Sequence, residues 1–267
     1  MAEFSGKVIV VTGASEGIGR ALCLALAPQG PKLVLSARNE ERLASAAKEC
    51  EALGAETLVV LADVTDPEAC GNLMTRTVEH FGGLDVLVNN AGGTMWALFE
   101  EVEDLSIFER LMRQNYLSSV YCTYHALPHL KSSQGMIVAV ASLAGLNGVP
   151  TRTGYAASKH AMFGFFESLR IEVEDAEVDV VMIAPDFVVT EIHKRALKGD
   201  GTPLEKTPLQ EGKVMSAADC AAIIVDGMER RKRLVITSLR GKVGRWLKVI
   251  APKAMDGIAK RAIASGK

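Results

Sequence analysis

A tyrosine and a lysine in the middle of the chain have types and spacing suited to proton transfer. Tyr155 and Lys159 form a Tyr-x-x-x-Lys motif, and Ser142 precedes it. Because positions four apart share one face of a helix, both side chains are expected to enter one cleft. An ammonium near a phenol stabilises the phenolate, so Lys159 is expected to lower the pKa of Tyr155 from about 10. Such a phenol exchanges protons near neutral pH, but the motif alone is weak evidence.

Length and composition favour one α/β domain with a substantial core. The chain has 267 residues, of which 48% are hydrophobic and 23% charged. Its net charge of −2 argues against a nucleic-acid-binding surface. Five scattered cysteines without a Cys-x-x-Cys pair predict no metal site and reduced thiols, which is typical of a cytoplasmic protein. The start of the chain resembles neither a secretory signal nor a membrane anchor.

A glycine-rich turn near the N-terminus is the first further motif that suggests a cofactor for the tyrosine and lysine. An apolar run over Lys7–Val11 predicts a strand, and Ala21–Ala27 predicts a helix. Between them lie Gly13, Gly17 and Gly19. Glycines here allow a pyrophosphate to approach backbone N–H groups at the helix N-terminus. The alternative is an ordinary glycine-rich turn.

The end of the second predicted strand, Lys32–Ser36, indicates which dinucleotide is bound. A NAD site needs an acidic side chain here, whereas a NADP site needs positive charge for the 2′-phosphate. The chain has Ala37 and then Arg38, whose planar guanidinium suits a phosphate. Ser15 and Ser36 offer further hydroxyl groups. We therefore predict NADP(H), the alternative being that Arg38 is simply solvated.

These motifs together resemble the short-chain dehydrogenase/reductase family. The glycine spacing Gly-x-x-x-Gly-x-Gly, the Asn-Asn-Ala-Gly sequence at 89–92 and Tyr-x-x-x-Lys all match, and the resemblance extends to about Thr190. It implies a single Rossmann-type, doubly wound domain over residues 1–240, with a mostly parallel seven-stranded sheet and helices on both faces. Residues 241–267 are then a basic, amphipathic C-terminal extension, packed on the domain or peripheral to it.

The resemblance also implies roles for individual residues. Asn115 kinks a long helix predicted over 105–130 and holds a water for proton relay, Ser142 bonds the substrate oxygen, Tyr155 exchanges the proton, and Lys159 binds the nicotinamide ribose. The cofactor-binding residues implied are Gly13, Ser15, Gly17, Ile18, Gly19, Arg38, Asp63, Val64, Asn90, Ala91, Gly92, Tyr155, Lys159, Val188 and Thr190.

Two positions leave alternatives open. Asp63 is a candidate helix cap as well as a cofactor contact, although Thr65 or Asp66 would serve equally as the cap. Asp186 stands where the family has glycine, which puts the local backbone in doubt, although aspartate tolerates φ > 0 better than most residues. The polar, loop-rich segment 191–213 fits a mobile lid.

The implied activity is hydride transfer between NADP(H) and a carbonyl or secondary alcohol. The segment 142–166 is most similar to the 11β-hydroxysteroid dehydrogenase-like branch, which indicates a hydrophobic substrate such as a steroid, retinoid or lipid. The alternative is a catalytically idle NADP-binding sensor or scaffold. The sequence lacks the Gly-x-Ser-x-Gly motif of serine hydrolases around Ser142.

The C-terminal part of the chain is strongly basic. Residues 230–267 hold 12 Lys or Arg and one acid, with two amphipathic pieces around Pro252. We expect this tail to pack on the domain or on a partner subunit, with contact to an anionic membrane surface as the alternative. Small residues in the helix that begins near Tyr155, together with the family resemblance, predict a homodimer or homotetramer.

Overall fold

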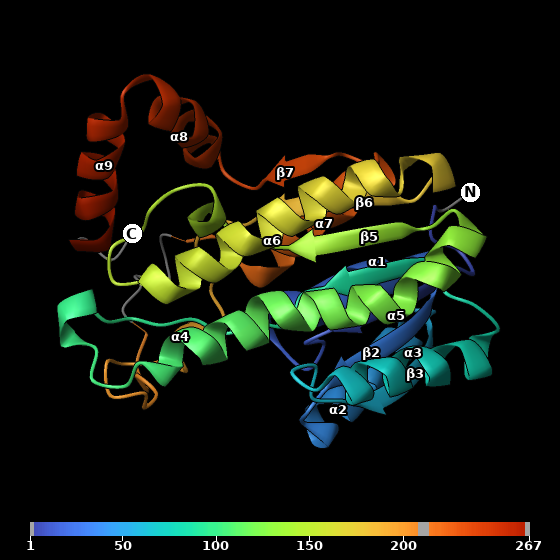
Figure 1. Cartoon of the computed structure of the whole chain (residues 1–267). Helices are drawn as coiled ribbons and strands as arrows, with labels where there is room; N and C mark the ends of the chain where they lie inside the picture. Colours follow the sequence, from blue (N-terminus) through green and yellow to red (C-terminus); the bar gives the residue numbers. More distant parts are fainter. Residues whose placement is uncertain (1–2, 208–213, 265–267) are drawn as a thin grey trace.

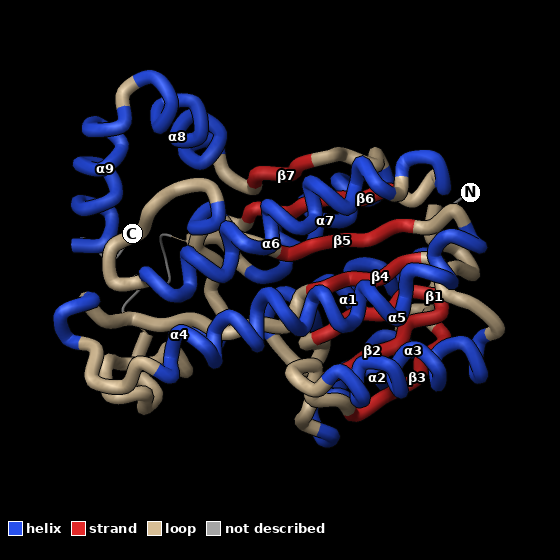
Figure 2. The backbone as a smooth tube through the Cα atoms, viewed as in Figure 1, coloured by secondary structure: helices blue, strands red, loops and turns tan. Residues whose placement is uncertain are grey.

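The computed structural model describes residues 3–207 and 214–264, with side chains as far as Arg261. One seven-stranded sheet with the order β3-β2-β1-β4-β5-β6-β7 lies at its centre (Figures 1 and 2). Every neighbouring pair of strands is parallel. The strands are β1 (Val8–Thr12), β2 (Lys32–Ala37), β3 (Glu56–Leu61), β4 (Val86–Asn89), β5 (Met136–Val140), β6 (Asp179–Ala184) and β7 (Leu234–Ile236). The predicted doubly wound Rossmann-type fold is confirmed.

Helices cover both faces of this sheet. Helices α1, α2 and α7 pack on one face, and α3, α5 and α6 pack on the other (Figure 1). The helices are α1 (Gly17–Leu26), α2 (Glu40–Ala52), α3 (Pro67–Phe81), α4 (Ser106–Leu111), α5 (Ser118–Ser133), α6 (Thr153–Glu172), α7 (Ala217–Glu229), α8 (Leu239–Ile250) and α9 (Pro252–Ala264).

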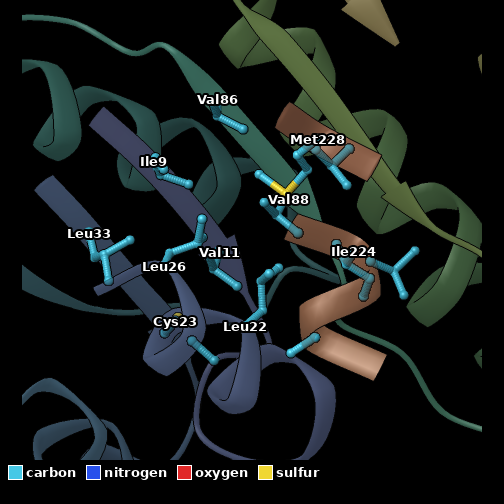
Figure 3. Close-up of a cluster of buried hydrophobic side chains, with 14 of the residues drawn as sticks. Ile9, Val11, Leu22, Cys23, Leu26, Leu33, Val86, Val88, Ile224 and Met228 are labelled. Atoms are coloured by element: carbon cyan, nitrogen blue, oxygen red, sulfur yellow. The ribbon is translucent and has the colours of Figure 1, made fainter. Parts of the chain in front are cut away.

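Strand β1 is apolar from Val8 to Val11 because helices cover both faces of the sheet. Side chains alternate between the faces of a strand, so Ile9 and Val11 join Leu22 of α1 and Ile224 of α7 (Figure 3). Val8 and Val10 join the cluster on the opposite face, which includes Phe166 of α6. Because both faces are covered, neither set of positions tolerates polar side chains.

The strand order opens a crevice beside β1. The chain first moves outward from β1 through β2 to β3, and then returns through α3 to place β4 on the other side of β1. The connections after β1 and β4 therefore diverge at the carboxyl edge of the sheet, which is where open α/β sheets bind ligands.

Two helices differ from the sequence prediction. The first helix begins at Gly17 rather than Ala21, because Arg20 N–H already bonds to Glu16 O at 3.2 Å. The long helix predicted over 105–130 contains a π-helical segment, Met112–Leu117, between α4 and α5. A π-helix widens the backbone by one residue per turn and is frequent at functional sites.

Helices α8 and α9 form a hairpin that stands outside the sheet (Figure 1). Gly241 brings α8 close to the domain, since a Cβ there would lie 2.7 Å from Leu143 and 2.9 Å from Ile236. Lys248 Nζ donates to Leu146 O at 2.6 Å. The predicted division at residue 240 stays a prediction, but α8 begins at Leu239 and contacts the domain from its first turn. Within the described ranges, no helix combines the length and the apolar character needed to cross a membrane.

Asp186 fixes this hairpin to the loop that follows β6. Its carboxylate accepts hydrogen bonds from Ser238 Oγ at 2.5 Å and from Arg240 Nε and Nη2 at 2.5 and 2.7 Å. It also accepts from Phe187 N at 2.8 Å. Asp186 does not have positive φ, so the tolerance for φ > 0 that we invoked is not needed. The side chain instead replaces glycine because it anchors the start of α8.

Burial by itself would raise the pKa of Asp186, but the hydrogen bonds from Arg240 and Ser238, the charge of Arg240 and the Phe187 N–H together lower the pKa below its ordinary value. A depressed carboxyl pKa contributes stability above the unfolded-state pKa of about 3.9, and this contribution disappears as pH falls through the folded-state pKa.

We predict that Asp186→Asn loosens α8. At pH 7 the amides of Leu239–Ile250 should exchange with solvent about ten-fold faster than in the wild type, because a charged hydrogen-bond acceptor is lost. The difference should begin to shrink only below about pH 3.9, the pKa of the unfolded state, and should vanish once the pH has fallen through the lower pKa of the folded state, where the wild-type carboxyl is protonated as well. Hydrogen exchange followed by mass spectrometry measures this.

Asp179→Asn is the matched control, since its pair with Arg231 lies on the surface and such pairs contribute little. Equal protection of α8 in the wild type and in Asp186→Asn would contradict the assigned role.

Candidate active site

A cavity of about 1180 Å³ lies at the carboxyl edge of the sheet. Its wall is formed by the glycine turn after β1, the ends of β2 to β6, the start of α6 and the α8–α9 hairpin. All of the sequence-predicted site residues except Gly19, Ser36 and Asn115 line it. The fold thus brings side chains that are far apart in the chain to one continuous space.

The glycine turn leaves one end of this cavity open to an anion. Gly13 and Gly17 have φ of +67° and +56°, which other residues rarely adopt. Glu16 precedes α1 without capping it, so the first N–H groups of this helix have no side-chain partner there. Gly19 lies behind the turn, where a Cβ would come within 2.5 Å of Asn90 Nδ2. These features fit a pyrophosphate, which helix N-termini bind through free N–H groups.

Thr12 and Asn90 hold the turn against the end of β4. The Thr12 hydroxyl donates to Val88 O at 3.2 Å and accepts from Asn90 N at 2.9 Å and Ala91 N at 3.1 Å. Asn90 Nδ2 donates to Thr12 O at 2.8 Å. The residues Asn90, Ala91 and Gly92 consequently form a fixed floor next to Gly13.

Arg38 marks the end of the cavity beyond β2. Its Nη1 lies 3.7 Å from Asp63 Oδ2, and the guanidinium is largely exposed. Asp63 does not cap a helix: Asp66 caps α3, while Asp63 accepts from Thr65 N and Oγ1 at 3.0 and 2.8 Å. Of the two serines, Ser15 lines the cavity, but the expected contribution of Ser36 is wrong, because its side chain alternates into the buried interior and is not part of the wall.

An ion-pair cluster lines the cavity beside the glycine turn. Glu16 pairs with both Arg42 of α2 and Arg195 of the segment after β6. The predicted lid, 191–213, is described as far as residue 207, and 208–213 lie outside the described residues. Its described part packs on the domain, with Trp96 N donating to Leu197 O at 2.8 Å and Leu197 N to Thr94 O at 3.0 Å.

Tyr155 and Lys159 lie on the first turns of α6 and face the cavity wall that Ser142 also forms. Both are buried, and Lys159 Nζ lies 5.9 Å from the centroid of the Tyr155 ring. The ammonium donates to Val140 O at 3.0 Å. Burial lowers the pKa of Lys159 from 10.5 to about 7. Ser142 Oγ accepts from Ala144 N at 3.2 Å, which fixes the hydroxyl at the end of β5.

The expected lowering of the pKa of Tyr155 by Lys159 is wrong for this structure. Burial raises the pKa of Tyr155, and the Ser142 hydroxyl and the charge of Arg152 offset this only in part. A lysine with a pKa of about 7 is neutral at the pH where a buried phenol ionises, so it supplies no charge to stabilise the phenolate. Tyr155 is therefore protonated at neutral pH.

Asn115 lies beneath the cavity in the π-helical segment. Its Oδ1 accepts from Gly93 N at 2.7 Å, and its Nδ2 donates to Gly93 O at 3.0 Å and to Ser158 Oγ at 2.8 Å. Ser158 Oγ in turn donates to Tyr155 O at 2.8 Å. The side chain thus connects the floor after β4 to the turn of α6 that carries Tyr155. The water assigned to it by resemblance stays a prediction.

Val188 and Thr190 line the cavity after β6, and the segment that carries them contacts the glycine turn. A Cβ at Gly17 would lie 3.2 Å from Thr190 Cγ2. His193 Nε2 donates to Val188 O at 3.2 Å, so its Nδ1 is left as an acceptor. Burial and the charge of Arg152 lower the pKa of His193 to about 4, and the ring is neutral.

Sequence reasoning missed two parts of the wall. Arg152 precedes Tyr155 by one helical turn, and that spacing was an available signal. The α8–α9 hairpin was not expected to reach the site, yet it supplies an apolar surface. Its apolar lining residues are Leu239, Val243, Leu247, Met255, Ile258 and Ala259. Over the described ranges, no cluster of three or more His, Cys, Asp or Glu side chains is placed to hold a metal ion.

Comparisons with known proteins agree with this geometry. The family description "short chain dehydrogenase" matches residues 7–200. The chain is 39% identical over 263 residues to 11-beta-hydroxysteroid dehydrogenase-like 4A of Arabidopsis thaliana, covering 97% of this chain and 85% of that protein. It is 36% identical to 11-beta-hydroxysteroid dehydrogenase 1A of the same plant, covering 94% and 74%.

A solved structure gives the same result at the level of the fold. The crystal structure of a short chain dehydrogenase/reductase from Burkholderia phymatum in complex with NAD matches with a TM-score of 0.83 and 27% identity, covering 95% of this chain and 96% of that chain. On the family match, the relatives and the fold together, this chain belongs to the short-chain dehydrogenase/reductase family of oxidoreductases and is similar to its 11β-hydroxysteroid dehydrogenase branch.

Proposed function

We propose that the protein transfers hydride between NADP(H) and a carbonyl or secondary alcohol of a hydrophobic small molecule. The observation that carries the proposal is that Ser142, Tyr155 and Lys159 face one cavity that continues to the uncapped N-terminus of α1. When bound, the nicotinamide ring supplies or takes up the hydride.

The protein side chains handle the proton and the substrate oxygen. In the reducing direction Tyr155, whose raised pKa keeps it protonated, donates its proton to the oxygen as negative charge develops there. The Ser142 hydroxyl, held at the end of β5, bonds the same oxygen. Lys159, with a pKa of about 7, exchanges protons near neutral pH and binds the nicotinamide ribose. Asn115 holds Gly93 and Ser158 in place around them.

Positive charge at the end of β2 supports NADP(H) over NAD(H). Arg38 and Arg42 line this part of the cavity, and the strand ends in Ala37 rather than in an acid. An acidic side chain there would bind a ribose 2′-hydroxyl, whereas a guanidinium binds a 2′-phosphate.

The apolar hairpin surface supports a lipid-like, retinoid or steroid substrate. The side chains of Leu239, Val243 and Leu247 face the cavity, and similar proteins are named hydroxysteroid dehydrogenases. If the protein were a catalytically idle sensor or scaffold, Tyr155 and Ser142 would have no function in it, although hydrogen bonds position both at the cavity. Absence of turnover across a broad carbonyl panel would favour that alternative.

The outer face of α6 supports a homodimer or homotetramer. Ala157, Gly164 and Ser168 are small and exposed, and open space lies beside Gly164. Such a surface lets a second helix approach closely. Sedimentation equilibrium that returns only the 28.6 kDa of one chain would contradict this assembly.

The exposed face of α8 supports contact with an anionic membrane surface. Trp246, Val249 and Ile250 are all more than half exposed and lie on one face of the helix, three and four positions apart. Basic side chains flank them, which is typical of helices that lie in the interface of a bilayer. Leu239, Val243 and Leu247 line the cavity instead, so the cavity and the proposed membrane surface use different side chains of α8. With five buried free cysteines, we place the protein in the cytoplasm, peripheral to a membrane.

Tyr155→Phe should abolish turnover and spare cofactor binding. Removing the proton donor should lower kcat by about 100- to 10,000-fold, while the dissociation constant for NADPH, measured by fluorescence titration, stays within about three-fold of wild type because the ring still packs. Tyr124→Phe, on the exposed side of α5, is the control. Activity of Tyr155→Phe within ten-fold of wild type would overturn the assignment.

Arg38→Asp should reverse the cofactor preference. The ratio of kcat/KM with NADPH to that with NADH should fall by about 10- to 100-fold, the value of one or two charged hydrogen bonds. Arg76→Asp in α3, which is also exposed, should leave the ratio unchanged. A wild type that already prefers NADH would refute the role of Arg38.

Trp246→Glu should weaken binding to vesicles. The wild type should sediment with vesicles of phosphatidylcholine and phosphatidylserine, and its bound fraction should decrease with added salt. The affinity of the variant for the same vesicles should be lower by at least about ten-fold. Leu53→Glu, an exposed position far from α8 in the sequence, serves as the control. Binding that is equal for both variants, or absent in the wild type, would count against the membrane contact.

A further inference from the structure

Arg152 is a buried cation in the wall of the cavity, next to the tyrosine. Only 4% of its surface is exposed, and it precedes the first turn of α6. Its Cζ lies 5.8 Å from the centroid of the Tyr155 ring. Throughout the described part of the chain, no acidic side chain forms an ion pair with it. The guanidinium is therefore placed where a substrate would bind, with its charge uncompensated.

The contacts of Arg152 cover the faces of the guanidinium but not its edge. Trp96 and Phe187 lie over it, with ring centroids 4.5 and 4.9 Å from Cζ. On the edge, Nη2 lies 3.4 Å from His193 Nδ1, a long hydrogen bond to a neutral ring. The buried Nε–H has no partner. Aromatic rings stabilise a cation through its face, whereas the N–H groups need acceptors in the plane.

Arg152 nevertheless keeps its charge at neutral pH. Burial lowers its pKa from 12.5 to about 10, which is still well above 7. A buried charge without a counterion is strongly unfavourable. The structure consequently favours any ligand that brings a negative charge to this point.

Among the described residues, no acid in the cavity wall is free to supply this negative charge. The acids that line it are Glu16, Asp63 and Asp186. Glu16 pairs with Arg42 and Arg195, as described above. Asp63 faces Arg38 at the opposite end, and Asp186 is saturated by Ser238, Arg240 and the Phe187 N–H. This leaves a bound ligand as the source of the missing anion, as far as the described residues go.

We propose that Arg152 is an anion subsite that binds a carboxylate of the substrate. The two oxygens of a planar carboxylate can accept two parallel hydrogen bonds from the Nε–H and Nη–H groups along one edge of a guanidinium. Since Arg152 and Tyr155 lie side by side, the carboxylate is within a few bonds of the reacting carbonyl or alcohol carbon. The preferred substrate is then an amphiphile, with its acid end at Arg152 and an apolar body along the α8–α9 hairpin.

This inference rests on the proposed oxidoreductase function, and a matched substrate pair tests it. Aliphatic 3-oxo acids and their methyl esters share one reacting group and differ in charge. With NADPH, wild type should show kcat/KM at least about 100-fold higher for the acid, as expected from one charged two-point contact. The ratio should approach one in Arg152→Met and be partly retained in Arg152→Lys, while Arg76→Met should leave it unchanged. A general loss of activity in a variant lowers kcat/KM for the acid and for the ester alike, so it leaves their ratio unchanged.

A binding measurement covers the case in which Arg152→Met does not fold. Trp96 stacks on Arg152, so its fluorescence reports on this point. In a Trp246→Phe background, where Trp96 is the remaining tryptophan, octanoate should change the emission at concentrations at least about ten-fold lower than octanamide does. Added salt should weaken the effect of octanoate alone.

The outcomes separate the two proposals. Equal kcat/KM for acids and esters, or equal binding of octanoate and octanamide, would overturn the anion subsite and leave the oxidoreductase proposal standing. Binding selective for octanoate without reduction of any carbonyl compound would support the subsite and overturn the oxidoreductase proposal.

Discussion

Removal of charged groups from water at the start of α6 is the constraint on which the site depends. Within two helical turns the fold buries Arg152, Tyr155 and Lys159. Burial lowers the pKa of the lysine to about 7 and raises the pKa of the tyrosine, so the two groups depart from their ordinary values in opposite directions. At neutral pH the phenol is therefore protonated, while the amine beside it titrates.

The π-helical segment and the loop that follows β4 hold these groups in position relative to one another. Asn115 satisfies both backbone groups of Gly93 and the hydroxyl of Ser158, and a Cβ at Gly92 would come within 2.8 Å of its Oδ1. The buried amide is thus bonded on every side that faces the protein, and its replacement by an apolar side chain would leave Gly93 unsatisfied. Because leaving these buried polar groups unpaired would cost free energy, their hydrogen bonds stabilise the geometry around Tyr155.

The C-terminal hairpin extends the same site beyond the sheet. Asp186 lies in the loop between β6 and Val188, and its carboxylate binds the first residues of α8. The start of the hairpin is therefore connected directly to the segment that lines the cavity. A glycine at position 186 could not make this connection, which gives a physical reason for the departure from the family pattern.

The sequence by itself determined the parts that depend on local pattern. The apolar strands, the glycine turn and the shared helical face of Tyr155 and Lys159 follow from spacings of a few residues, whereas the choice of Asp66 among three candidate caps came from the structure. The tertiary structure alone decided the sign of the tyrosine pKa shift, since desolvation depends on which distant segments cover the phenol. It also decided that Arg152 has no acidic partner among the described residues and that α8 forms a wall of the cavity, because both are set by contacts between segments that the chain keeps far apart.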